Sequence, residues 1–477
     1  MIQIPEQLHA WMSAVAEPVA MAVIAIGLLQ NVMYLTQLML AGLSAARRAP
    51  VQRINSLWNL YSDVSPPIAL LVPAHNEQET VVENVNSLLS LQYPTFEVLV
   101  INDGSKDETL QRLIETFGLE PVERAHDLVT PHQPIRGLYA SPHLPRLLVI
   151  DKENGGKADA LNAGINLARA PLFCAVDADS LLEAGALLRA VQPFIDNPLS
   201  TVVVGGTVRI VNGCRVRAGR VVDIGPPRNL LALFQTVEYL RAFLMGRLAW
   251  SEIGSLVNVS GAFGIFRRRT AMEVGGYSRA TVGEDIEIIV RIHRYMSEHK
   301  RAYTIKFIPD PVCWTEAPES LRVLARQRIR WQRGALETLF THRRMLFNPR
   351  YGRVGFAGLG DVLLADFLGP IAELLGYILI PLFWLLGALD GAYMLAFIAV
   401  TFSLGIFISV STLILEEIQF HQFPKVRDLL VLAGAAVMEN FGYRQANNFW
   451  KVVGLLRFLR GQKGGWGQMT RTGFRQS

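Results

Sequence analysis

The stretch IALLVPAHNE (68–77) is the first of five short apolar runs, each of which ends in a polar or glycine-rich segment. The other four are EVLVINDGS (97–105), RLLVIDKENGGK (146–157), LFCAVDAD (172–179) and TVVVGGT (201–207). Each run is continuously apolar rather than alternating, which is typical of strands buried on both faces of a parallel sheet. Helical patterns at 79–91, 107–118 and 157–170 separate the first strands, as βαβ units require. The sequence therefore predicts an α/β fold with a mostly parallel sheet.

Two segments of this region lack a clear period. Residues 119–145 are rich in proline and contain three histidines, and residues 209–228 contain five arginines and a Pro-Pro pair. We expect irregular loops in both places, with solvent-facing histidines in the first and with the second near the mouth of the active site.

Three other segments are long and apolar enough for a membrane. Residues 18–46 and 391–415 carry no charged side chain, and residues 367–389 carry only Glu373. A hydrocarbon core ~30 Å thick is crossed by roughly 20 apolar residues, so each segment is long enough to span it. The composition agrees, with 51% hydrophobic residues, 18% charged residues and a mean hydropathy of +0.26. We expect an integral membrane protein with three spans.

Charge sets the expected orientation. The basic cluster ARRAPVQR (46–53) follows the first apolar segment. By the positive-inside rule the N-terminus lies outside and the sheet domain lies in the cytoplasm, at a bacterial inner or plasma membrane. The formal net charge of +5 comes partly from residues that flank the membrane segments, which suits anionic lipid headgroups better than nucleic acid. Three cysteines without CxxC spacing fit a reduced compartment and no zinc site.

The C-terminal region has a more ambiguous pattern. Residues 429–442 are apolar but short, and NFWKVVGLLRFLRG (448–461) has aromatic and aliphatic residues opposite basic ones. We interpret 429–461 as a re-entrant or interfacial pair, with a fourth full span as the alternative. The expected organisation is an N-terminal membrane helix with a basic flank (1–54), a cytoplasmic α/β domain (55–345) and a C-terminal membrane region (346–477).

Acidic residues end several of the predicted strands. In an open α/β sheet, ligands bind beyond the carboxyl ends of the strands, so Asp103, Asp177 and Asp179 are predicted to meet at one rim. The DAD motif could place carboxylates on Mg²⁺ or Mn²⁺, which prefer oxygen ligands. The alternative is that Asp179 caps a helix over 180–192. Lys157 in NGGK suits a diphosphate, although a solvated lysine would look the same.

The neighbouring strand ends suit a nucleoside. Asp103 could accept hydrogen bonds from a uracil ring or a ribose, and Pro73 and Glu77 in VPAHNE could share that contact. The alternatives are local: Ser105 or Asp107 would cap the next helix, and Glu77 would open a helix of its own.

Two later motifs suit the chemical step. In GED (283–285), Asp285 could act as a general base with Glu284 beside it, or both could complement the dipole of a helix. In QRIRW (327–331), Arg330 could stabilise a departing diphosphate and Trp331 could stack on a sugar. The alternative is a cationic amphipathic helix on lipid headgroups.

The order of these motifs carries a family resemblance. The chain carries, in this order, Asp103, the DxD at 177–179, the ED at 284–285, the QxxRW at 327–331 and then membrane spans. This ordered set resembles that of the membrane-embedded inverting glycosyltransferases of family 2. That group contains the cellulose, chitin, hyaluronan and poly-N-acetylglucosamine synthases. The resemblance covers roughly residues 65–345.

The resemblance implies a Rossmann-like GT-A domain fused to transmembrane helices, a UDP-sugar donor and a metal ion. By matching motif, Asp103 would hold the uridine, and Asp177 and Asp179 would bind the diphosphate and the metal. Asp285 would deprotonate the acceptor hydroxyl. The acceptor and diphosphate site would be lined by Gln327, Arg330 and Trp331, and the acceptor terminus would be shaped by Ser260 and Gly261. One departure is that the usual TED is GED here, so that Gly283 loses a hydroxyl contact but leaves the base in place.

The implied reaction is attack of an acceptor hydroxyl on a UDP-sugar, which forms a β linkage. The QxxRW motif favours repeated addition to a polysaccharide with export. Three spans are few for a polymer channel, so a second copy, an export partner or the re-entrant segment would complete it. The alternatives are a single transfer to a membrane lipid, as in ceramide glucosyltransferases, and a catalytically silent nucleotide-sugar sensor or scaffold. The sequence does not identify the sugar.

Overall fold

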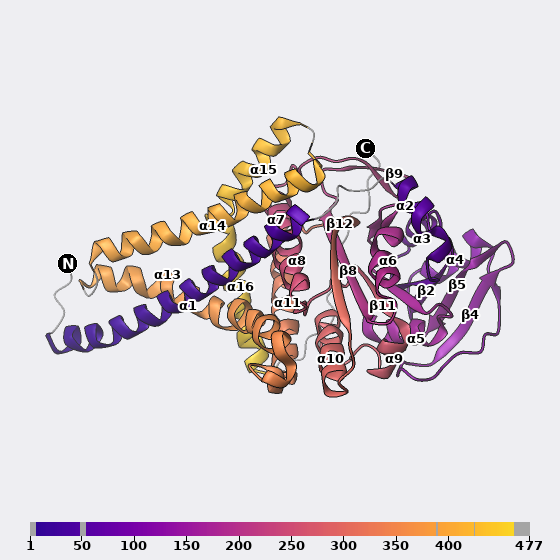
Figure 1. Ribbon diagram of the computed structural model, residues 1–477, viewed down its shortest axis with the longest axis horizontal. Coiled ribbons are helices and arrows are strands. Elements are labelled where there is room, and N and C mark those ends of the chain that lie inside the picture. The colour runs from indigo at the N-terminus through magenta and orange to yellow at the C-terminus, as the bar shows by residue number, and fades with distance from the viewer. Residues whose placement is uncertain (1–5, 48–53, 388–389, 424, 462–477) are drawn as a thin grey trace.

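The computed structural model of the 477-residue chain describes residues 6–47, 54–387, 390–423 and 425–461. The molecule is elongated: a large sheet with its covering helices forms one end, and a bundle of long helices that includes the N-terminal helix forms the other (Figure 1).

The sheet has ten strands in the order β3-β4-β5-β2-β1-β6-β11-β8-β12-β7. They are β1 (Ile68–Ala74), β2 (Phe96–Asp103), β3 (Glu120–Pro121), β4 (Ile135–Ser141), β5 (Leu144–Lys152), β6 (Leu172–Val176), β7 (Leu181–Leu182), β8 (Thr201–Ile210), β11 (Phe263–Arg267) and β12 (Thr304–Thr315). Parallel pairing joins β5, β2, β1 and β6, and also β8 and β12. All five predicted apolar runs are strands, and the α/β fold is confirmed.

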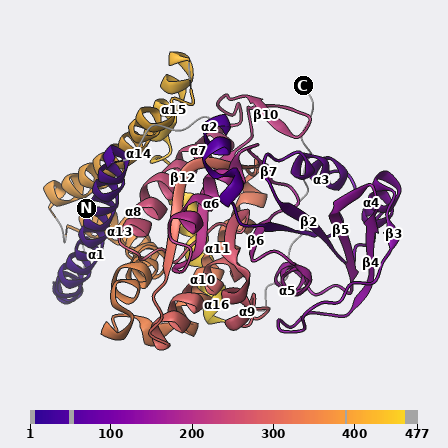
Figure 2. The same cartoon turned by 45° about the vertical axis from the view of Figure 1, so that its right-hand side comes forward.

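The order of the strands reverses between β1 and β6. After β1 the chain moves to β2 and β5 on one side, and it then returns to β6 on the other side of β1. The connecting helices are α3 (Val81–Leu89), α4 (Thr109–Phe117) and α5 (Lys157–Leu167). Because parallel crossovers are right-handed, the reversal puts α5 on the opposite face from α3 and α4 (Figure 2). Such a switch point is where open α/β sheets bind ligands.

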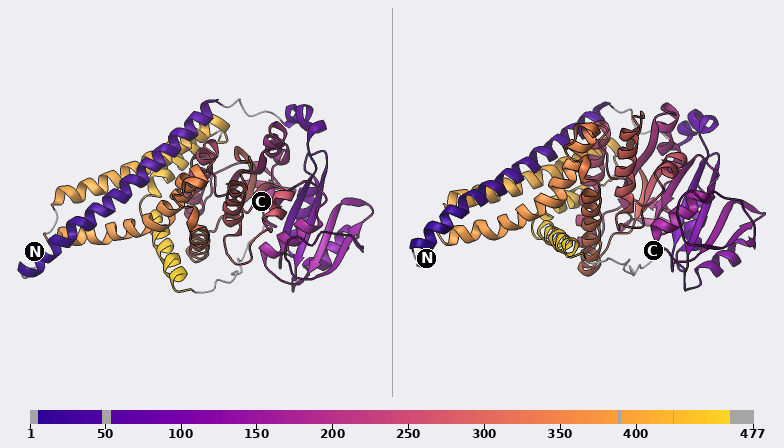
Figure 3. Two further views of the ribbon diagram at one scale, coloured as in Figure 1. Left: turned by 60° about the horizontal axis from the view of Figure 1, so that its bottom comes forward. Right: turned by 90° about the horizontal axis from the view of Figure 1, so that it is seen from below.

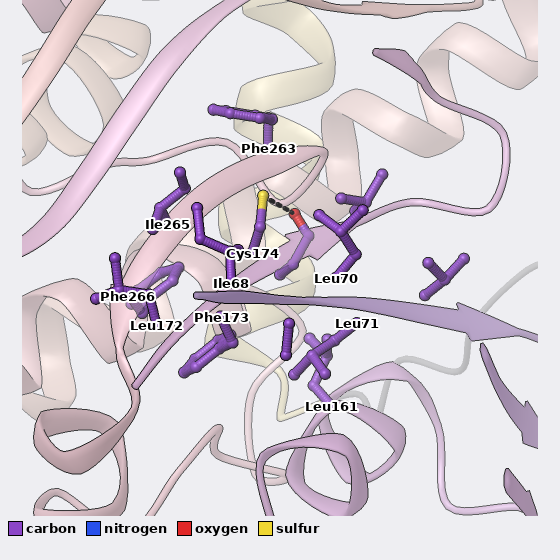
Figure 4. Close-up of a cluster of buried hydrophobic side chains, with 14 of the residues drawn as sticks. Ile68, Leu70, Leu71, Leu161, Leu172, Phe173, Cys174, Phe263, Ile265 and Phe266 are labelled. Atoms are coloured by element: carbon purple, nitrogen blue, oxygen red, sulfur yellow. Dashed lines mark hydrogen bonds between the residues drawn. The ribbon is translucent and has the colours of Figure 1, made fainter. Parts of the chain in front are cut away.

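The core of the sheet is continuous across the parallel and antiparallel parts. Side chains of β1, β6 and β11 pack together with Leu161 of α5 (Figure 4). Phe173 and Phe266 stack with ring centroids 5.2 Å apart, and Cys174 is buried among the same residues as a free thiol. Since these strands are apolar on both faces, a polar site can form only where they end.

The two segments expected to be irregular contain strands. β4, within 119–145, pairs antiparallel with β5 and with the short edge strand β3, and its half-exposed residues give no apolar run to detect. Within 209–228, β9 (Arg215–Arg217) and β10 (Arg220–Asp223) form a hairpin through Ala218 and Gly219, both with positive φ. The hairpin docks on α3, where Ser87 Oγ donates to the Gly219 carbonyl at 2.9 Å, and none of its residues lines the cavity described below. Its expected place near the active-site mouth stays a prediction.

Three helices in the described part of the chain are long and apolar enough to cross a membrane: Pro18–Arg47, Val354–Leu385 and Thr401–Phe420. The first is most of α1 (Glu6–Arg47), and the third is the larger part of α14 (Gly391–Phe420). The second begins earlier than expected, because η5 (Val354–Gly358), α12 (Leu359–Val362) and η6 (Leu363–Leu368) continue into α13 (Gly369–Leu385). Helices α1, α13 and α14 run side by side (Figure 3). Residues 388–389 and most of the basic cluster, 48–53, lie outside the described residues.

The remaining helices pack on the sheet, on this bundle or between the two. They are α2 (Ile54–Tyr61), η1 (Ser62–Val64), α6 (Ala186–Asp196), α7 (Leu230–Leu240), η2 (Arg241–Arg247), α8 (Leu248–Glu252), α9 (Arg268–Glu273), α10 (Glu284–Glu298), α11 (Leu321–Thr341), η3 (Arg343–Met345), η4 (Pro349–Tyr351), α15 (Val426–Met438) and α16 (Tyr443–Leu459). With 13 residues, α15 is only about 20 Å long, and α16 packs along α11. The alternative of a fourth spanning helix is therefore not supported within the described ranges.

Candidate active site

A cavity of ≈ 2140 Å³ opens at the carboxyl ends of the parallel strands. Its lining includes every residue to which the sequence analysis assigned a role: Pro73, Glu77, Asp103, Lys157, Asp177, Asp179, Ser260, Gly261, Glu284, Asp285, Gln327, Arg330 and Trp331. The fold thus brings four motifs that are far apart in sequence to one cavity. What each residue does there stays a prediction.

Asp103 ends β2 and is only 3% exposed. Lys152 Nζ (2.6 Å) and the Gly155 N–H (3.0 Å) donate to its Oδ1. The Gly156 N–H (2.7 Å) and the Asn154 amide (3.2 Å) donate to its Oδ2. A carboxylate offers about four lone-pair sites, so all of them are taken. Asp103 therefore clamps the NGG loop to β2, and contact with a nucleoside requires one of these donors to be released.

Lys152, which is fully buried, extends this network to α5. Its Nζ lies 2.7 Å from Asp159 Oδ1, and Arg279 Nη1 donates to Asp159 Oδ2 at 2.9 Å. Burial alone would raise the pKa of Asp159, but hydrogen bonds from Lys152 and from the Gln133 N–H hold it below its usual range. Because Arg279 lies just before GED, this buried network connects the NGGK loop to the segment that carries the predicted base.

Lys157 lies between the DxD and the GED motifs. Its Nζ forms an ion pair with Asp177 and donates to the Gly261 carbonyl at 3.2 Å. Burial would lower the pKa of Lys157, but the charges of Asp177 and Glu284 raise it above its ordinary value. The Gly261 N–H donates to Asp285 Oδ2 at 3.2 Å. A Cβ on Gly261 would lie 3.0 Å from Lys157 Nζ and 3.3 Å from Asp285 Oδ2, so a side chain there would crowd both groups.

Asp179 is not a helix cap. The helix expected over 180–192 begins only at Ala186, with Gly185 before it, because Leu181 and Leu182 form β7 and pair with β12. Within the described ranges, no group of three or more His, Cys, Asp and Glu side chains is arranged to hold a metal. Mg²⁺ usually takes one or two protein carboxylates and completes its shell with phosphate and water. The hard oxygen donors of Asp177 and Asp179 fit that pattern.

Glu284 and Asp285 are the first two residues of α10, so their charges also complement its dipole, as the alternative interpretation expected. Glu284 is 6% exposed. Burial raises the pKa of Glu284 to about 7; Lys157 opposes this increase and Asp285 adds to it. A carboxyl group that titrates near neutrality beside a cation is common at functional sites.

Gly283 brings the GED motif against the QxxRW helix. A Cβ added to Gly283 would lie 2.7 Å from the Cα of Gly334 in α11. A Cβ added to Gly334 would in turn lie 2.7 Å from the Cα of Gly283. The two helices therefore touch backbone to backbone. The departure from TED has a steric reason, since a threonine side chain does not fit against Gly334.

The QxxRW residues lie on α11, which packs between α10 and α16. Contact of this helix with lipid headgroups stays a prediction. Gln327 is buried and its Oε1 has no hydrogen-bond partner within the described structure, whereas Trp331 is 43% exposed. The Arg328 guanidinium lies over the Trp331 ring at 4.5 Å and forms an ion pair with Glu238 at 2.8 Å.

One wall of the cavity was not predicted from the sequence. Tyr239 of α7 and Phe243 and Arg247 of η2 line it, with Tyr239 and Phe243 ring centroids 5.7 Å apart. These three residues are spaced i, i+4 and i+8, so they share one helical face. The alignment of two aromatic residues and an arginine at this spacing is the signal that could have found them.

The cavity continues toward the candidate spanning helices. Gln30, Tyr34 and Gln37 of α1 line it, as do Glu373 of α13 and Lys451 of α16. Polar side chains on membrane helices are costly unless they face a cavity or each other. The site is therefore continuous with a polar space inside the helix bundle.

The fold and the cavity define a GT-A glycosyltransferase with helices that could cross a membrane. Residues 172–410, half of the chain, match the family described as glycosyl transferase family group 2, and residues 69–124 match glycosyl transferase family 2. The chain belongs to glycosyltransferase family 2.

Relatives and a solved structure agree with this family. The chain is 30% identical over 273 residues to a poly-β-1,6-N-acetyl-D-glucosamine synthase of Staphylococcus epidermidis, covering 57% of this chain and 55% of the relative. It is 28% identical over 288 residues to the synthase of that name from Staphylococcus aureus strain COL, covering 60% and 58%. The matched region thus spans a little over half of each relative. A mannosyltransferase of Pyrobaculum calidifontis, solved with GDP-Man and Mn²⁺, shares the fold with a TM-score of 0.55, at 16% identity and with 95% and 100% of the two chains covered.

Proposed function

We propose that this protein transfers a sugar from a UDP-sugar to a growing, membrane-associated β-linked polysaccharide, with inversion at the anomeric carbon, repeated addition and export. UDP-N-acetylglucosamine is the proposed donor, because the curated relatives are named as synthases of a β-linked N-acetylglucosamine polymer. The observation that carries the proposal is that the DxD, GED and QxxRW residues line one cavity that continues between the candidate spanning helices.

In the proposed reaction, Asp285 accepts the proton of an acceptor hydroxyl. The hydroxyl oxygen forms a bond to the anomeric carbon while the bond from that carbon to the diphosphate oxygen breaks, and the electron pair leaves with UDP. Lys157 and Arg330 are the proposed cations beside the departing diphosphate. The Gly261 N–H at 3.2 Å from Asp285 supports this arrangement, because it fixes the carboxylate beside the segment proposed to hold the acceptor.

We propose that Asp177 and Asp179 hold Mg²⁺ or Mn²⁺. When bound, such a cation neutralises charge on a departing diphosphate. The Pyrobaculum calidifontis mannosyltransferase was solved in complex with Mn²⁺ and a nucleotide sugar, which supports testing Mn²⁺ first.

The remaining predicted residues divide between donor and acceptor. Asp103, with Pro73 and Glu77, is proposed for the nucleoside. Ser260 and Gly261 are proposed for the acceptor terminus, and Gln327 and Trp331 for the sugar beyond it. The unpartnered Gln327 Oε1 supports a polar ligand, since a buried acceptor without a donor is costly.

For the organisation we propose the division 1–54, 55–345 and 346–477, with the N-terminus outside and the catalytic domain in the cytoplasm. The start of α1, the end of α13 and the start of α14 lie at the end of the molecule far from the sheet, which supports this orientation (Figure 1). A second copy of the chain or an export partner is the proposed completion of a polymer path.

The test uses the full chain in detergent or nanodiscs, with labelled UDP-N-acetylglucosamine and Mg²⁺ or Mn²⁺. A ladder of high-mass product supports repeated addition, whereas one labelled glycolipid supports a single transfer to a lipid. Absence of turnover with a panel of UDP- and GDP-sugars would overturn the enzymatic proposal and favour a sensor or scaffold.

A further inference from the structure

Three aromatic side chains and one arginine form a continuous row along one wall of the cavity. The ring centroids of Trp331 and Tyr239 are 6.5 Å apart, those of Tyr239 and Phe243 are 5.7 Å apart, and the Arg247 guanidinium carbon lies 3.9 Å from the centre of the Phe243 ring. We call these four residues the aromatic row. It begins at the QxxRW motif, where Trp331 is exposed to the cavity, and ends at a cation.

The Arg247 guanidinium is held in place, but not all of its N–H groups have a hydrogen-bond acceptor within the described structure. Its Nε donates to the Asn258 carbonyl at 3.2 Å, and its plane is supported by Phe243. Its Nη1 is buried and has no hydrogen-bond partner within the described structure. Burial lowers the pKa of Arg247 to about 10, with Asp285 and Tyr239 opposing the decrease, so the guanidinium remains charged at neutral pH. A buried charged donor without an acceptor is costly, and an oxygen-bearing ligand would satisfy it.

Lys157 and Arg247 meet the segment 258–261 at different points. Lys157 forms an ion pair with Asp177 of the DxD and donates to the Gly261 carbonyl at 3.2 Å. Arg247 instead contacts Asn258, three residues before Gly261, whose N–H donates to Asp285. The arginine and the proposed base therefore meet the same short segment, which is the segment proposed to hold the acceptor terminus.

The backbone beneath Arg247 is unusual and firmly anchored. η2 is a π-helical segment, a conformation that is rare and frequent at functional sites. At its start, Arg241 donates to Ser409 of α14 at 2.7 Å and forms an ion pair with Glu439. Near its end, Gly246 lies beside Gln37 of α1. The segment is wedged between two candidate spanning helices, so the position of Arg247 is fixed from the membrane side.

We propose that Tyr239, Phe243 and Arg247 form an acceptor subsite that extends the acceptor position already proposed for Trp331. In this subsite Trp331 and Tyr239 pack against sugar faces, and Arg247 donates a hydrogen bond to an oxygen of the terminal sugar beside the hydroxyl that Asp285 deprotonates. The expected ligand is a neutral glycan with β-linked N-acetylhexosamine units. This inference rests on the proposed glycosyl transfer.

The experiment compares Arg247→Met and Arg247→Lys with wild type in the purified full chain. Arg269→Met is the matched control, because Arg269 lies on α9, outside the lining of the cavity, where it forms an ion pair with Glu273. Release of UDP from UDP-N-acetylglucosamine is measured while a β-linked N-acetylglucosamine tetrasaccharide is varied. Binding of UDP with Mn²⁺ is measured separately by calorimetry, which also reports that each variant is folded.

The expected result is that Arg247→Met raises the acceptor KM by about tenfold or more while UDP affinity stays within about twofold of wild type. Arg247→Lys should recover part of the loss, and Arg269→Met should match wild type. An unchanged acceptor KM in Arg247→Met overturns the inference, as does a parallel loss of UDP affinity, which would put Arg247 on the leaving-group side. If wild type itself transfers to no acceptor, the proposed function fails and this inference fails with it; if only the Arg247 comparison fails, the proposed function stands.

Discussion

Replacing Gly283 with alanine should disturb the site without touching any side chain proposed for chemistry. The new Cβ would lie 2.7 Å from the Cα of Gly334 and 3.0 Å from its carbonyl carbon, both of them backbone atoms of α11. Neither side can rotate away, since one partner is the first-turn backbone of α10 and the other is mid-helix backbone. The two helices must separate.

The geometry sets the size of the effect. Ordinary van der Waals contact begins at 3.4 Å, so the Cβ is about 0.7 Å too close. Overpacking of this kind typically costs about 1–3 kcal/mol of stability. Because Gly283 directly precedes Glu284 and Asp285, the same shift moves the proposed base relative to Gln327 and Trp331. A misplacement of about 1 Å can cost about 10²-fold in rate, so we expect a loss of about ten- to a hundredfold in kcat.

The assay measures initial rates of UDP release and the unfolding midpoint of each purified variant. Gly334→Ala should reproduce the Gly283→Ala defect, because it adds its Cβ to the same contact. Gly434→Ala in α15 is the control, since a Cβ there meets nothing within 4 Å. Gly283→Thr would restore the family's TED motif and yet should be worse than alanine. If Gly283→Ala or Gly283→Thr turns over like Gly434→Ala, the steric reasoning is wrong.

Three further predictions concern charge and metal. Lys152→Met leaves the buried carboxylates of Asp103 and Asp159 without their shared cation and should lower the free energy of unfolding by about 3–5 kcal/mol. Adding Asp159→Asn to the same chain should restore part of this loss. An unchanged denaturation midpoint in Lys152→Met would refute the prediction. Because burial raises the pKa of Glu284 from 4.5 to about 7, its protonated form stabilises the fold below pH 4.5, and that contribution is lost as pH rises through 7. Between pH 5 and 8 wild type should therefore lose up to about 3 kcal/mol relative to Glu284→Gln, and parallel stability curves would contradict the assignment. EDTA should abolish UDP release and added Mn²⁺ or Mg²⁺ should restore it, with Asp179→Asn requiring more metal; full turnover in EDTA would exclude the proposed metal role.

The central strands were predictable because burial on both faces leaves a simple record in the sequence. Runs such as those at 68–72 and 146–150 are apolar at nearly every position, and the polar residues that follow them had to lie at one edge of the sheet. The three candidate spanning helices were predictable for a similar reason, since a membrane requires long uncharged segments.

Features that depend on contacts between distant residues were not predictable. The strand β4 is half exposed, so its pattern resembles that of a loop. The aromatic row joins α7 and η2 to α11, and only the folded chain brings Tyr239 beside Trp331. Gly283 in the sequence suggested only a lost hydroxyl, whereas the structure shows that Gly334 leaves no room for one.

The most direct test of the account is turnover by Asp285→Asn, measured together with UDP binding. Asparagine keeps the size of the side chain and can still accept the Gly261 N–H, but it cannot take a proton from the acceptor. If Asp285 is the base of one assembled site, UDP release should fall by about 10²–10⁴-fold while UDP affinity stays within about twofold of wild type. Wild-type turnover by Asp285→Asn would contradict the claim that these carboxylates form a glycosyl-transfer site.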